Sequence, residues 1–135
     1  MLETDIAYAA GLVDGEGTIG VYMRGKGSVR FKVAVYNTEY PMMEWLQLRF
    51  GGKIHRVGKI RAGRKQEYAW YKSDNEFQEF LSLVLPYLVT KRLRAELALK
   101  AWHGRGEVSR EVRRQGVPVE LINRRLGLVA AVKGA

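Results

Sequence analysis

The chain has 135 residues and is 47% hydrophobic, which is enough for one domain with a substantial core and excludes a disordered basic tail. Lysine and arginine total 23 against 14 acidic residues, and the net charge of +9 favours a polyanionic partner, although ribosomal and membrane-surface proteins share such a balance. The absence of cysteine excludes disulfides and thiolate metal sites, and the start of the chain lacks the pattern of an export signal, so we expect an intracellular protein.

A buried helix is predicted for residues 4–16. Thr4 can cap it, and Asp5 lies in the first turn, where a negative charge suits the helix dipole. From Ile6 to Val13 no polar face is left, so the helix is either embedded in a membrane or buried on both sides. The run is much shorter than the roughly 20 residues that a membrane span needs, which favours burial in protein.

The two sides of this helix differ in bulk. Ile6, Ala9 and Val13 form one side, which can cover a core. Small residues on the other side let two backbones approach closely, so this side predicts contact with a second copy of the chain. The alternative is that its glycines simply end the helix. This small side consists of Ala7, Ala10, Gly11, Asp14 and Gly15.

Glu16 stands where the helix must end, close to the negative end of the helix dipole. An unpaired carboxylate is unfavourable there unless a cation binds beside it. Two-fold pairing through the small side of the helix would bring two Glu16 side chains near the axis. Clustered carboxylate oxygens suit Mg²⁺. Otherwise Glu16 is an exposed acid in a turn.

Two hairpins are predicted from alternating sequence. Residues 18–24 pair with 28–36, and residues 53–60 pair with 66–72 around a basic turn. The positions expected to face the core are Ile19, Val21, Met23, Val29, Phe31, Val33, Val35, Ile54, Tyr68 and Trp70. The opposite face carries Tyr22, Arg24, Ser28, Arg30, Lys32, Ala34, Tyr36, Lys53, His55, Val57, Lys59, Glu67, Ala69 and Tyr71.

Helices separate and follow these hairpins. Thr38 is expected to cap the first of them, with Pro41 in its first turn, and Gly51-Gly52 ends it. An amphipathic helix is expected over residues 74–88, ended near a proline, and another over residues 92–103. Their inward side chains are expected to be Met42, Met43, Leu46, Phe50, Phe77, Phe80, Leu81, Val84, Leu85, Leu93, Leu97 and Trp102.

The last part of the chain is the least informative. Residues 104–106 break the pattern, residues 107–115 form a charged, helix-like run, and Pro118 opens a last helix. We treat residues 1–104 as the domain and residues 105–135 as its helical extension. This extension can pack on the domain, wrap a partner subunit, or clamp phosphates through Arg110, Arg113, Arg114, Arg124 and Arg125.

The order helix, two strands, helix, two strands, two helices predicts an α+β fold, a four-stranded antiparallel sheet with its helices on one face. A solvated strand face is normally charged, but here one sign prevails, which favours contact with nucleic acid. A two-stranded ribbon can enter the DNA major groove, where all four base pairs differ, so its side chains can read base edges. The basic residues of this face are Arg24, Arg30, Lys32, Lys53 and Lys59, with Glu67 as their counter-charge.

Residues 9–17, Ala-Ala-Gly-Leu-Val-Asp-Gly-Glu-Gly, resemble the LAGLIDADG motif of homing endonucleases. Five of the nine positions are identical, and Val13 and Glu16 are conservative replacements. At the other two, alanine replaces leucine and glycine replaces alanine, which costs core volume and helix propensity but leaves the chemistry intact. The motif occurs once, and in this family a single motif implies a homodimer. The resemblance covers about residues 4–103 and implies a saddle-shaped sheet in the order α-β-β-α-β-β-α-α.

The resemblance implies catalytic roles for three residues. Glu16 would bind Mg²⁺ or Mn²⁺, beside the main chain of Gly15. Glu39, just after the second strand, would position the attacking water, although Asn37 is equally suited and Glu39 can simply lie in the first turn of a helix. Lys91 follows the proline-ended helix and would stabilise developing negative charge. Otherwise Lys91 is an ordinary cation before the next helix.

The implied activity is metal-assisted hydrolysis of double-stranded DNA by a homodimer, at a long, partly palindromic target and with staggered ends. The resemblance further implies a protein that is encoded within an intron, with an intein as the other possible host element, and that works in the cytoplasm of a prokaryote or in an organelle. We expect neither a membrane partner nor a small-molecule substrate. The dimer contact would involve Ala7, Ala10, Gly11 and Asp14. The DNA contacts would come from Tyr22, Arg24, Lys26, Ser28, Arg30, Lys32, Tyr36, Lys53, His55, Lys59, Arg61, Arg64, Lys65, Glu67 and Tyr71.

Two other functions remain open. An RNA-splicing maturase or a non-cleaving DNA-binding regulator would keep the fold and the basic sheet, but neither requires Glu16 and Lys91. A structural RNA-associated protein would need only the positive charge. It would leave unexplained the small-faced helix that ends in acids.

Overall fold

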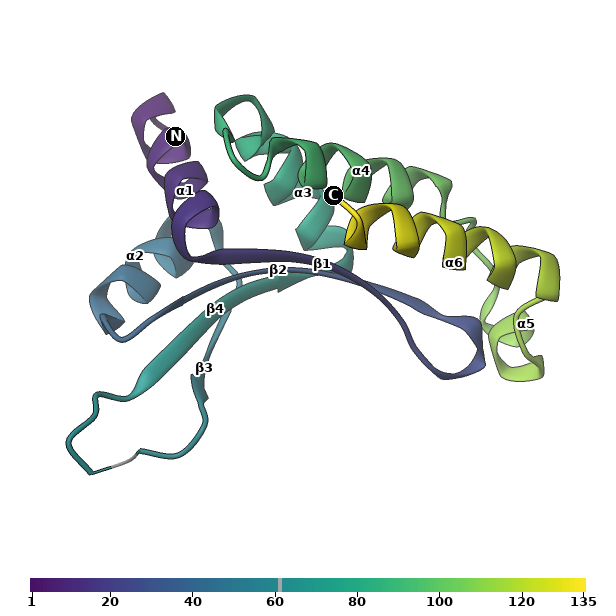
Figure 1. Ribbon diagram of the computed structural model, residues 1–135, viewed down its shortest axis with the longest axis horizontal. Coiled ribbons are helices and arrows are strands. Elements are labelled where there is room, and N and C mark those ends of the chain that lie inside the picture. The colour runs from purple at the N-terminus through teal and green to yellow at the C-terminus, as the bar shows by residue number, and fades with distance from the viewer. Residues whose placement is uncertain (61) are drawn as a thin grey trace.

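A computed structural model describes residues 1–60 and 62–135 (Figure 1). Single turns of 3₁₀ helix, Gly25–Gly27 and Leu85–Tyr87, accompany the longer elements. The longer elements are α1 (Glu3–Glu16), β1 (Gly17–Met23), β2 (Val29–Asn37), α2 (Tyr40–Phe50), β3 (Lys53–Val57), β4 (Glu67–Ser73), α3 (Asp74–Val84), α4 (Arg92–Gly104), α5 (Arg110–Gln115) and α6 (Val119–Lys133). The first eight of these follow the predicted order.

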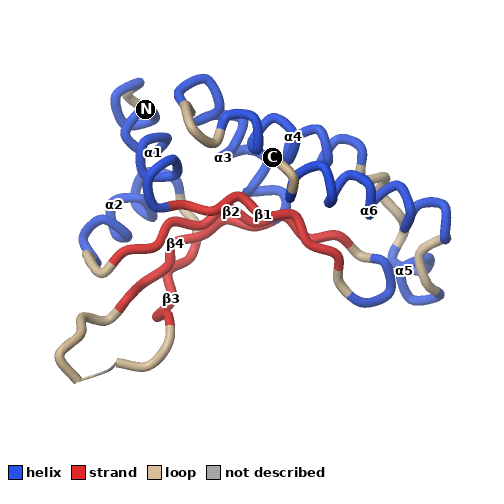
Figure 2. The backbone as a smooth tube through the Cα atoms, in the orientation of Figure 1, coloured by secondary structure: helices blue, strands red, loops and turns tan. Residues whose placement is uncertain are grey.

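The strands form one antiparallel sheet in the order β1-β2-β4-β3, which confirms the predicted α+β fold. The sheet is arched, with the long helices on its convex face, and the β1–β2 and β3–β4 hairpins reach toward opposite ends of the arch (Figures 1 and 2). No described helix covers the concave face (Figures 1 and 2). No described helix is both long enough and apolar enough to span a membrane.

Alternation along the strands separates the core from the concave face, as predicted. The strand register sets Val35 of β2 between Gly17 of β1 and Trp70 of β4, all on the helix side. Trp70 is completely buried, and its indole N–H donates a hydrogen bond to the carbonyl of Gly51 at 2.8 Å. Other buried core residues are Ala9, Ala10, Val13, Ile19, Val21, Phe31, Val33, Met43, Leu46, Phe50, Phe77, Phe80, Leu81, Val84 and Leu88.

Two predicted helix caps are wrong. α1 begins at Glu3 with Leu2 at its N-cap, so Thr4 lies inside the helix. Before α2, Glu39 rather than Thr38 takes the N-cap position, and no side chain caps the helix. The Oδ1 of Asn37 accepts a hydrogen bond from the main-chain N–H of Glu39 at 2.8 Å, in the turn that leads into α2. Asparagine readily forms such a turn with the chain two residues on.

Three element boundaries or faces also differ from prediction. β3 ends at Val57, so Lys59 lies in the loop beyond it. α3 ends at Val84, where a turn containing a proline begins, since proline cannot supply a helical N–H. Leu93 is 61% exposed, so its predicted inward position on α4 is wrong, whereas Trp102 is buried and Leu97 packs against the core as predicted. The buried residues of α4 are Ala95, Ala98, Leu99, Ala101 and Trp102.

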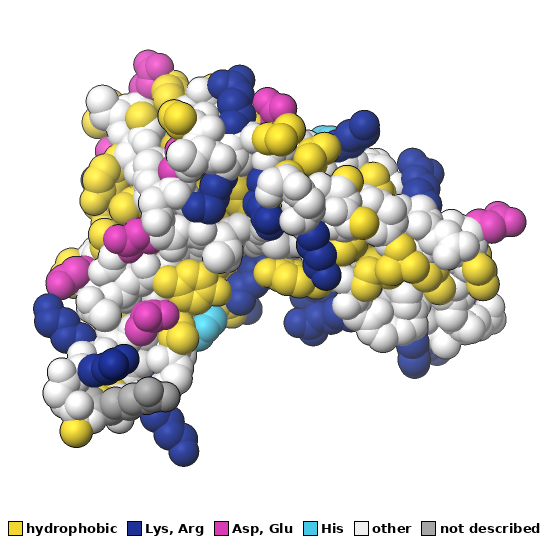
Figure 3. Space-filling view, in the orientation of Figure 1, with side chains coloured by type: hydrophobic (Ala, Val, Ile, Leu, Met, Phe, Trp, Pro, Cys, Tyr) yellow, Lys and Arg dark blue, Asp and Glu magenta, His cyan; other side chains and the backbone are white. Residues whose placement is uncertain are grey.

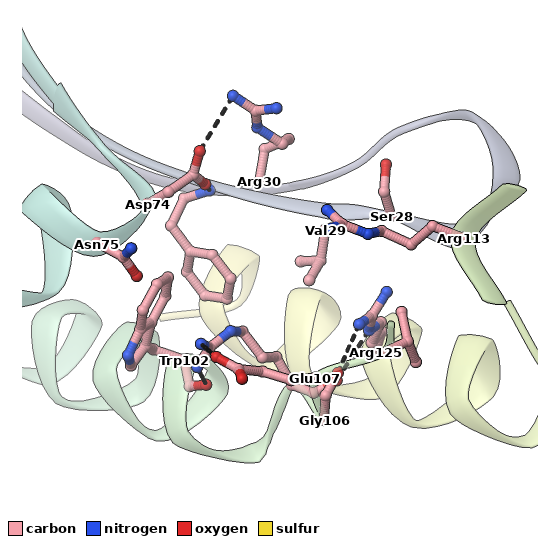
Figure 4. A pocket seen from close by; sticks show the side chains of 13 residues that line it. Ser28, Val29, Arg30, Asp74, Asn75, Trp102, Gly106, Glu107, Arg113 and Arg125 are labelled. Carbon is pink, nitrogen blue, oxygen red and sulfur yellow. Dashed lines mark hydrogen bonds and ion pairs between the residues drawn. The ribbon is translucent and has the colours of Figure 1, made fainter. Parts of the chain in front are cut away.

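The C-terminal extension packs on the rest of the chain, with α6 lying along α4 and β1 (Figure 1). Arg125 of α6, one of the arginines that the sequence offered for clamping phosphates, is buried, with 6% of its surface exposed. Instead its guanidinium donates to the carbonyls of Gly27 at 2.8 Å, Arg105 at 2.8 Å and Gly106 at 2.6 Å, part of which Figure 4 shows. Arg125 therefore ties the β1–β2 turn to the end of α4.

Replacing Arg125 with leucine should destabilise the fold. Three carbonyl groups lose their donor in a poorly hydrated place, so we expect the free energy of unfolding to fall by about 3 kcal/mol. Urea titration followed by circular dichroism measures this. Arg124→Leu, on the exposed side of the same helix, is the matched control and should change stability by no more than about 0.5 kcal/mol. Equal losses in both variants would contradict the role given to Arg125.

Candidate active site and basic sheet face

Glu16 is the last residue of α1, and its exposed side chain lies beside the end of β2. β1 starts with Gly17 opposite Val35, which brings Asn37, two residues further along β2, next to Glu16. The side-chain amide of Asn37 donates a short hydrogen bond to Oε2 of Glu16. Asn37 therefore binds the carboxylate of Glu16 through its amide N–H, while its amide oxygen accepts the hydrogen bond from Glu39 in the turn before α2.

Lys91 reaches the same end of α1 from a distant part of the sequence. Its Nζ donates a hydrogen bond to the main-chain carbonyl of Asp14 at 2.6 Å. α1 has no basic residue in its own last turn. The Lys91 ammonium supplies the positive charge that complements the negative end of this helix. The structure thus brings Lys91 to the helix end that carries Glu16, as the resemblance implied.

The Asp14 side chain binds the segment that carries Lys91, an arrangement that sequence reasoning missed. Its carboxylate accepts hydrogen bonds from the main-chain N–H of Val89 at 2.8 Å, the hydroxyl of Thr90 at 3.1 Å and the main-chain N–H of Lys91 at 2.9 Å. Burial alone would raise the pKa of Asp14, but the hydrogen bonds from these three residues outweigh it and hold the pKa below the ordinary value of 3.8.

The stabilisation that Asp14 provides should fade in acid. Because its pKa is lowered in the folded state, the carboxylate stabilises the fold above pH 3.8, and this contribution is lost as the pH falls through the folded-state pKa. At neutral pH, Asp14→Asn should lower the free energy of unfolding by about 1 kcal/mol, with allowance for solvent screening. Urea titrations of both proteins at neutral pH and below pH 3.8 should show that the difference between their free energies of unfolding shrinks in acid. A difference in the free energy of unfolding that grows in acid would contradict the lowered pKa of Asp14.

Asn37 and Glu39 were the two candidates, near the end of β2, for positioning the attacking water. The structure brings Asn37 to Glu16. Glu39 instead forms an exposed ion pair with Lys65, whose Nζ lies 3.3 Å from Oε1 of Glu39. That pair joins the start of α2 to the β3–β4 loop. Asn37 is therefore the better candidate for the role given to Glu39.

The small side of α1 is partly as predicted. Ala7, Gly11 and Gly15 are exposed, and a Cβ atom added to either glycine would meet nothing within 4 Å. Ala10 was expected on this surface but is completely buried in the core of the single chain. Asp14 was expected there too, but its carboxylate turns toward residues 89–91. The open stripe on α1 therefore consists of Ala7, Gly11 and Gly15.

The concave sheet face carries a connected set of polar and aromatic side chains. The ammonium of Lys32 lies 4.5 Å from the centre of the Tyr71 ring, and the His55 ring is 5.2 Å from the same ring on its β3 side. Tyr22 lies over Gly20, where a Cβ would clash with its ring. Ala34 and Ala69, at the middle of the face, are completely buried. Figure 3 shows dark-blue Lys and Arg side chains projecting below the arch and from the β3–β4 loop.

The register places most of the predicted DNA contacts on this face. Tyr22, Arg30, Lys32, Tyr36, Lys53, His55, Glu67 and Tyr71 lie at its alternating positions. Arg24, Lys26 and Ser28 lie in the β1–β2 turn, and Lys59, Arg64 and Lys65 lie in the β3–β4 loop. Arg61 lies outside the described residues.

The donor atoms at the end of α1 suit a hard divalent cation. Among the described residues there is no group of three His, Cys, Asp or Glu side chains that could enclose a metal ion. Glu16 provides one carboxylate, and the last turn of α1 provides main-chain carbonyls. Mg²⁺ typically takes one or two carboxylates and fills its shell with water and phosphate oxygens. The residues present therefore fit a Mg²⁺ site that other groups must complete.

No family model and no curated protein matches this sequence. Solved structures do match, and they show that the chain has the fold of the LAGLIDADG homing endonucleases. The archaeal intron-encoded homing endonuclease I-Vdi141I, complexed with DNA, aligns with a TM-score of 0.71 and 14% identity over 98% of this chain and 84% of its own. The homing endonuclease I-CvuI, in complex with a DNA target, aligns with a TM-score of 0.69 and 21% identity over 97% of this chain and 81% of its own.

A third structure differs in length. The LAGLIDADG homing endonuclease I-SmaMI, bound to cleaved DNA, aligns with a TM-score of 0.70 and 19% identity. The alignment covers 95% of this chain but only 43% of the I-SmaMI chain. The I-SmaMI chain is therefore more than twice as long as this chain, and less than half of it is matched.

Proposed function

We propose that this protein is a site-specific, metal-dependent endonuclease that hydrolyses double-stranded DNA as a homodimer of LAGLIDADG type. The observation that carries the proposal is the meeting of Glu16, Asn37 and Lys91 at one end of α1. This end adjoins an open concave face with a surplus of basic side chains. The fold is one that I-Vdi141I, I-CvuI and I-SmaMI hold in complexes with DNA.

Each residue of the site has a distinct task. Glu16 and the main chain near Gly15 would hold Mg²⁺ or Mn²⁺, which when bound lowers the pKa of a coordinated water and neutralises phosphate charge. Asn37 keeps the Glu16 carboxylate oriented through its amide N–H. The Lys91 ammonium offers a fixed positive charge where negative charge develops on phosphate oxygens.

A second copy of the chain would complete the site. The Asp14 carboxylate in the last turn of α1 is bound to residues 89–91, which leaves the Glu16 carboxylate of each chain for a metal ion, whereas cutting both strands of a duplex requires two such sites. The exposed stripe of Ala7, Gly11 and Gly15 allows two α1 helices to approach closely around a two-fold axis. The half-length match to I-SmaMI supports pairing of two units of this size.

The concave face would lie along the duplex. Lys32, His55 and Tyr71 occupy its centre and would read base edges in the major groove. Cations of the turns would bind phosphates, so affinity should fall steeply as salt rises. Two such faces in a dimer would read a long, partly palindromic site. We further propose that the protein is encoded within an intron and works in the cytoplasm of a prokaryote or in an organelle.

The test separates binding from cleavage. Duplexes that bind the protein are selected from a randomised library and from DNA of its host locus, in Ca²⁺, and the selected duplexes are then incubated with Mg²⁺ or Mn²⁺. We expect cuts in both strands at staggered positions that depend on the metal. Specific binding without any cut in either metal would overturn the nuclease proposal and favour a non-cleaving regulator or an RNA-splicing maturase.

A further inference from the structure

The segment between α3 and α4 is tied to α1 at both ends of that helix. Near the start of α1, the hydroxyl of Tyr87 donates a hydrogen bond to the Glu3 carboxylate at 2.6 Å. Near its end, Asp14 accepts three hydrogen bonds from residues 89–91. The main-chain carbonyl of Asp14 also accepts the hydrogen bond from the Lys91 ammonium. Asp14 thus contacts both the main-chain N–H and the side-chain ammonium of Lys91.

This segment has little else to hold it between its two anchors. Leu88 is 2% exposed and fixes one end in the core, and Lys91 caps α4 at the other, where its carbonyl accepts from the N–H of Ala95 at 2.9 Å. Between them, Val89 is 80% exposed and Thr90 is exposed as well. Without buried side chains, the path of these residues depends on hydrogen bonds. In this structure those bonds go to Asp14.

We infer that Asp14 is a positioning residue, which fixes the Lys91 ammonium at the end of α1 that carries Glu16. The inference rests on the proposed nuclease function. A lysine side chain has many rotamers, and a charge that must meet a developing charge works only when its place is fixed in advance. Asp14 binds Lys91 at two places. The Asp14 carboxylate accepts from the main-chain N–H of Lys91, and the Asp14 main-chain carbonyl accepts from Nζ of Lys91.

The test compares Asp14→Asn with a matched control on the same helix. Asp5→Asn removes the same charge from α1, but at the other end of the helix, where it breaks an ion pair with Arg49 on α2, at 3.2 Å. For Asp14→Asn we expect the single-turnover cleavage rate at saturating protein to fall about 10²-fold, while the dissociation constant for the duplex in Ca²⁺ changes by less than about threefold. Asp5→Asn should alter neither. Amide hydrogen exchange at Val89 and Lys91 should quicken in Asp14→Asn alone, which tests the tether without any cleavage.

A double-mutant cycle with Lys91→Met distinguishes positioning from a general loss of stability. If Asp14 acts through Lys91, Asp14→Asn should have almost no further effect on cleavage in a Lys91→Met background. Full additivity of the two losses would overturn the inference. Thr90→Val removes only the side-chain donor to Asp14, so it serves if Asp14→Asn fails to fold. A several-fold loss that vanishes in the Lys91→Met background supports the inference, and an unchanged rate overturns it.

The proposed function and this inference fail in different ways. If wild-type protein cuts no duplex, the proposed function is wrong, and the inference fails with it. If wild-type protein cuts and Asp14→Asn cuts equally fast, the inference alone is wrong.

Discussion

Replacing Glu16 with glutamine is expected to abolish DNA cleavage while DNA binding persists. The substitution keeps the size of the side chain, and the new amide oxygen can still accept the hydrogen bond from Asn37. It removes the negative charge that faces the Asn37 amide at the end of α1. Without that carboxylate, a hard divalent cation loses its charged ligand. We expect single-turnover cleavage in Mg²⁺ to slow by at least about 10³-fold.

The binding measurement uses Ca²⁺ and fluorescence anisotropy on the same duplex, and the dissociation constant should stay within about threefold of wild type. Glu44→Gln is the charge-matched control, because Glu44 lies exposed on α2. Glu39→Gln tests the other acid that the sequence offered. A greater loss of cleavage in Glu39→Gln than in Glu16→Gln would return the catalytic role to Glu39.

The strand faces were predictable from the sequence because side chains alternate along every strand. Apolar residues such as Ile19 and Val33 could face only the core, so the polar positions between them had to face the other way. The same rule placed Lys32, His55 and Tyr71 on the concave face. It could not show that these three side chains contact one another, because their contacts depend on how β2, β4 and β3 pair.

The site itself was predictable only in part. Glu16 could be predicted because an unpaired carboxylate is unfavourable at the C-terminal end of a helix. Lys91 could be predicted only from the family resemblance. The bonds from Asp14 to residues 89–91 join parts of the chain that are 75 to 77 residues apart, and no local pattern encodes such a contact. For the same reason, the sequence left Asn37 and Glu39 equal as candidates. The strand register sets Asn37 beside Glu16, which makes Asn37 the better candidate.

Arg125 shows that a basic residue can be wrongly assigned to the surface when only its charge, and not its position along the helix, is considered. Its charge grouped it with the exposed arginines of the extension, but it lies in a stripe with Ile122, Val129 and Val132 at helical spacing. A residue at that position faces inward whatever its charge. Its long side chain remains buried because main-chain carbonyls accept all three of its hydrogen bonds. The stripe was visible in the sequence, whereas the carbonyl partners were not.

Gly11 provides the sharpest test of the dimer, because substitutions there should have opposite effects on the single chain and on its pairing. A Cβ atom at Gly11 meets nothing within 4 Å in one chain, so Gly11→Leu should fit and should stabilise α1 by somewhat less than about 1 kcal/mol. In a dimer packed through Ala7, Gly11 and Gly15, the same leucine would push two helices apart. Overpacking of this kind costs about 1–3 kcal/mol per site, and the two-fold axis applies it twice.

We therefore expect Gly11→Leu to raise the dimer dissociation constant by at least about 30-fold and to abolish double-strand cleavage. Analytical ultracentrifugation across a concentration series measures the first effect, and a plasmid linearisation assay measures the second. Gly127→Leu is the matched control, because Gly127 also lies exposed in a helix where a Cβ meets nothing within 4 Å. It should gain the same helix stability and remain a cleaving dimer. If Gly11→Leu stays dimeric and cuts DNA, the two subunits do not meet through α1, and the pair of Glu16 side chains must be brought to the duplex in another way.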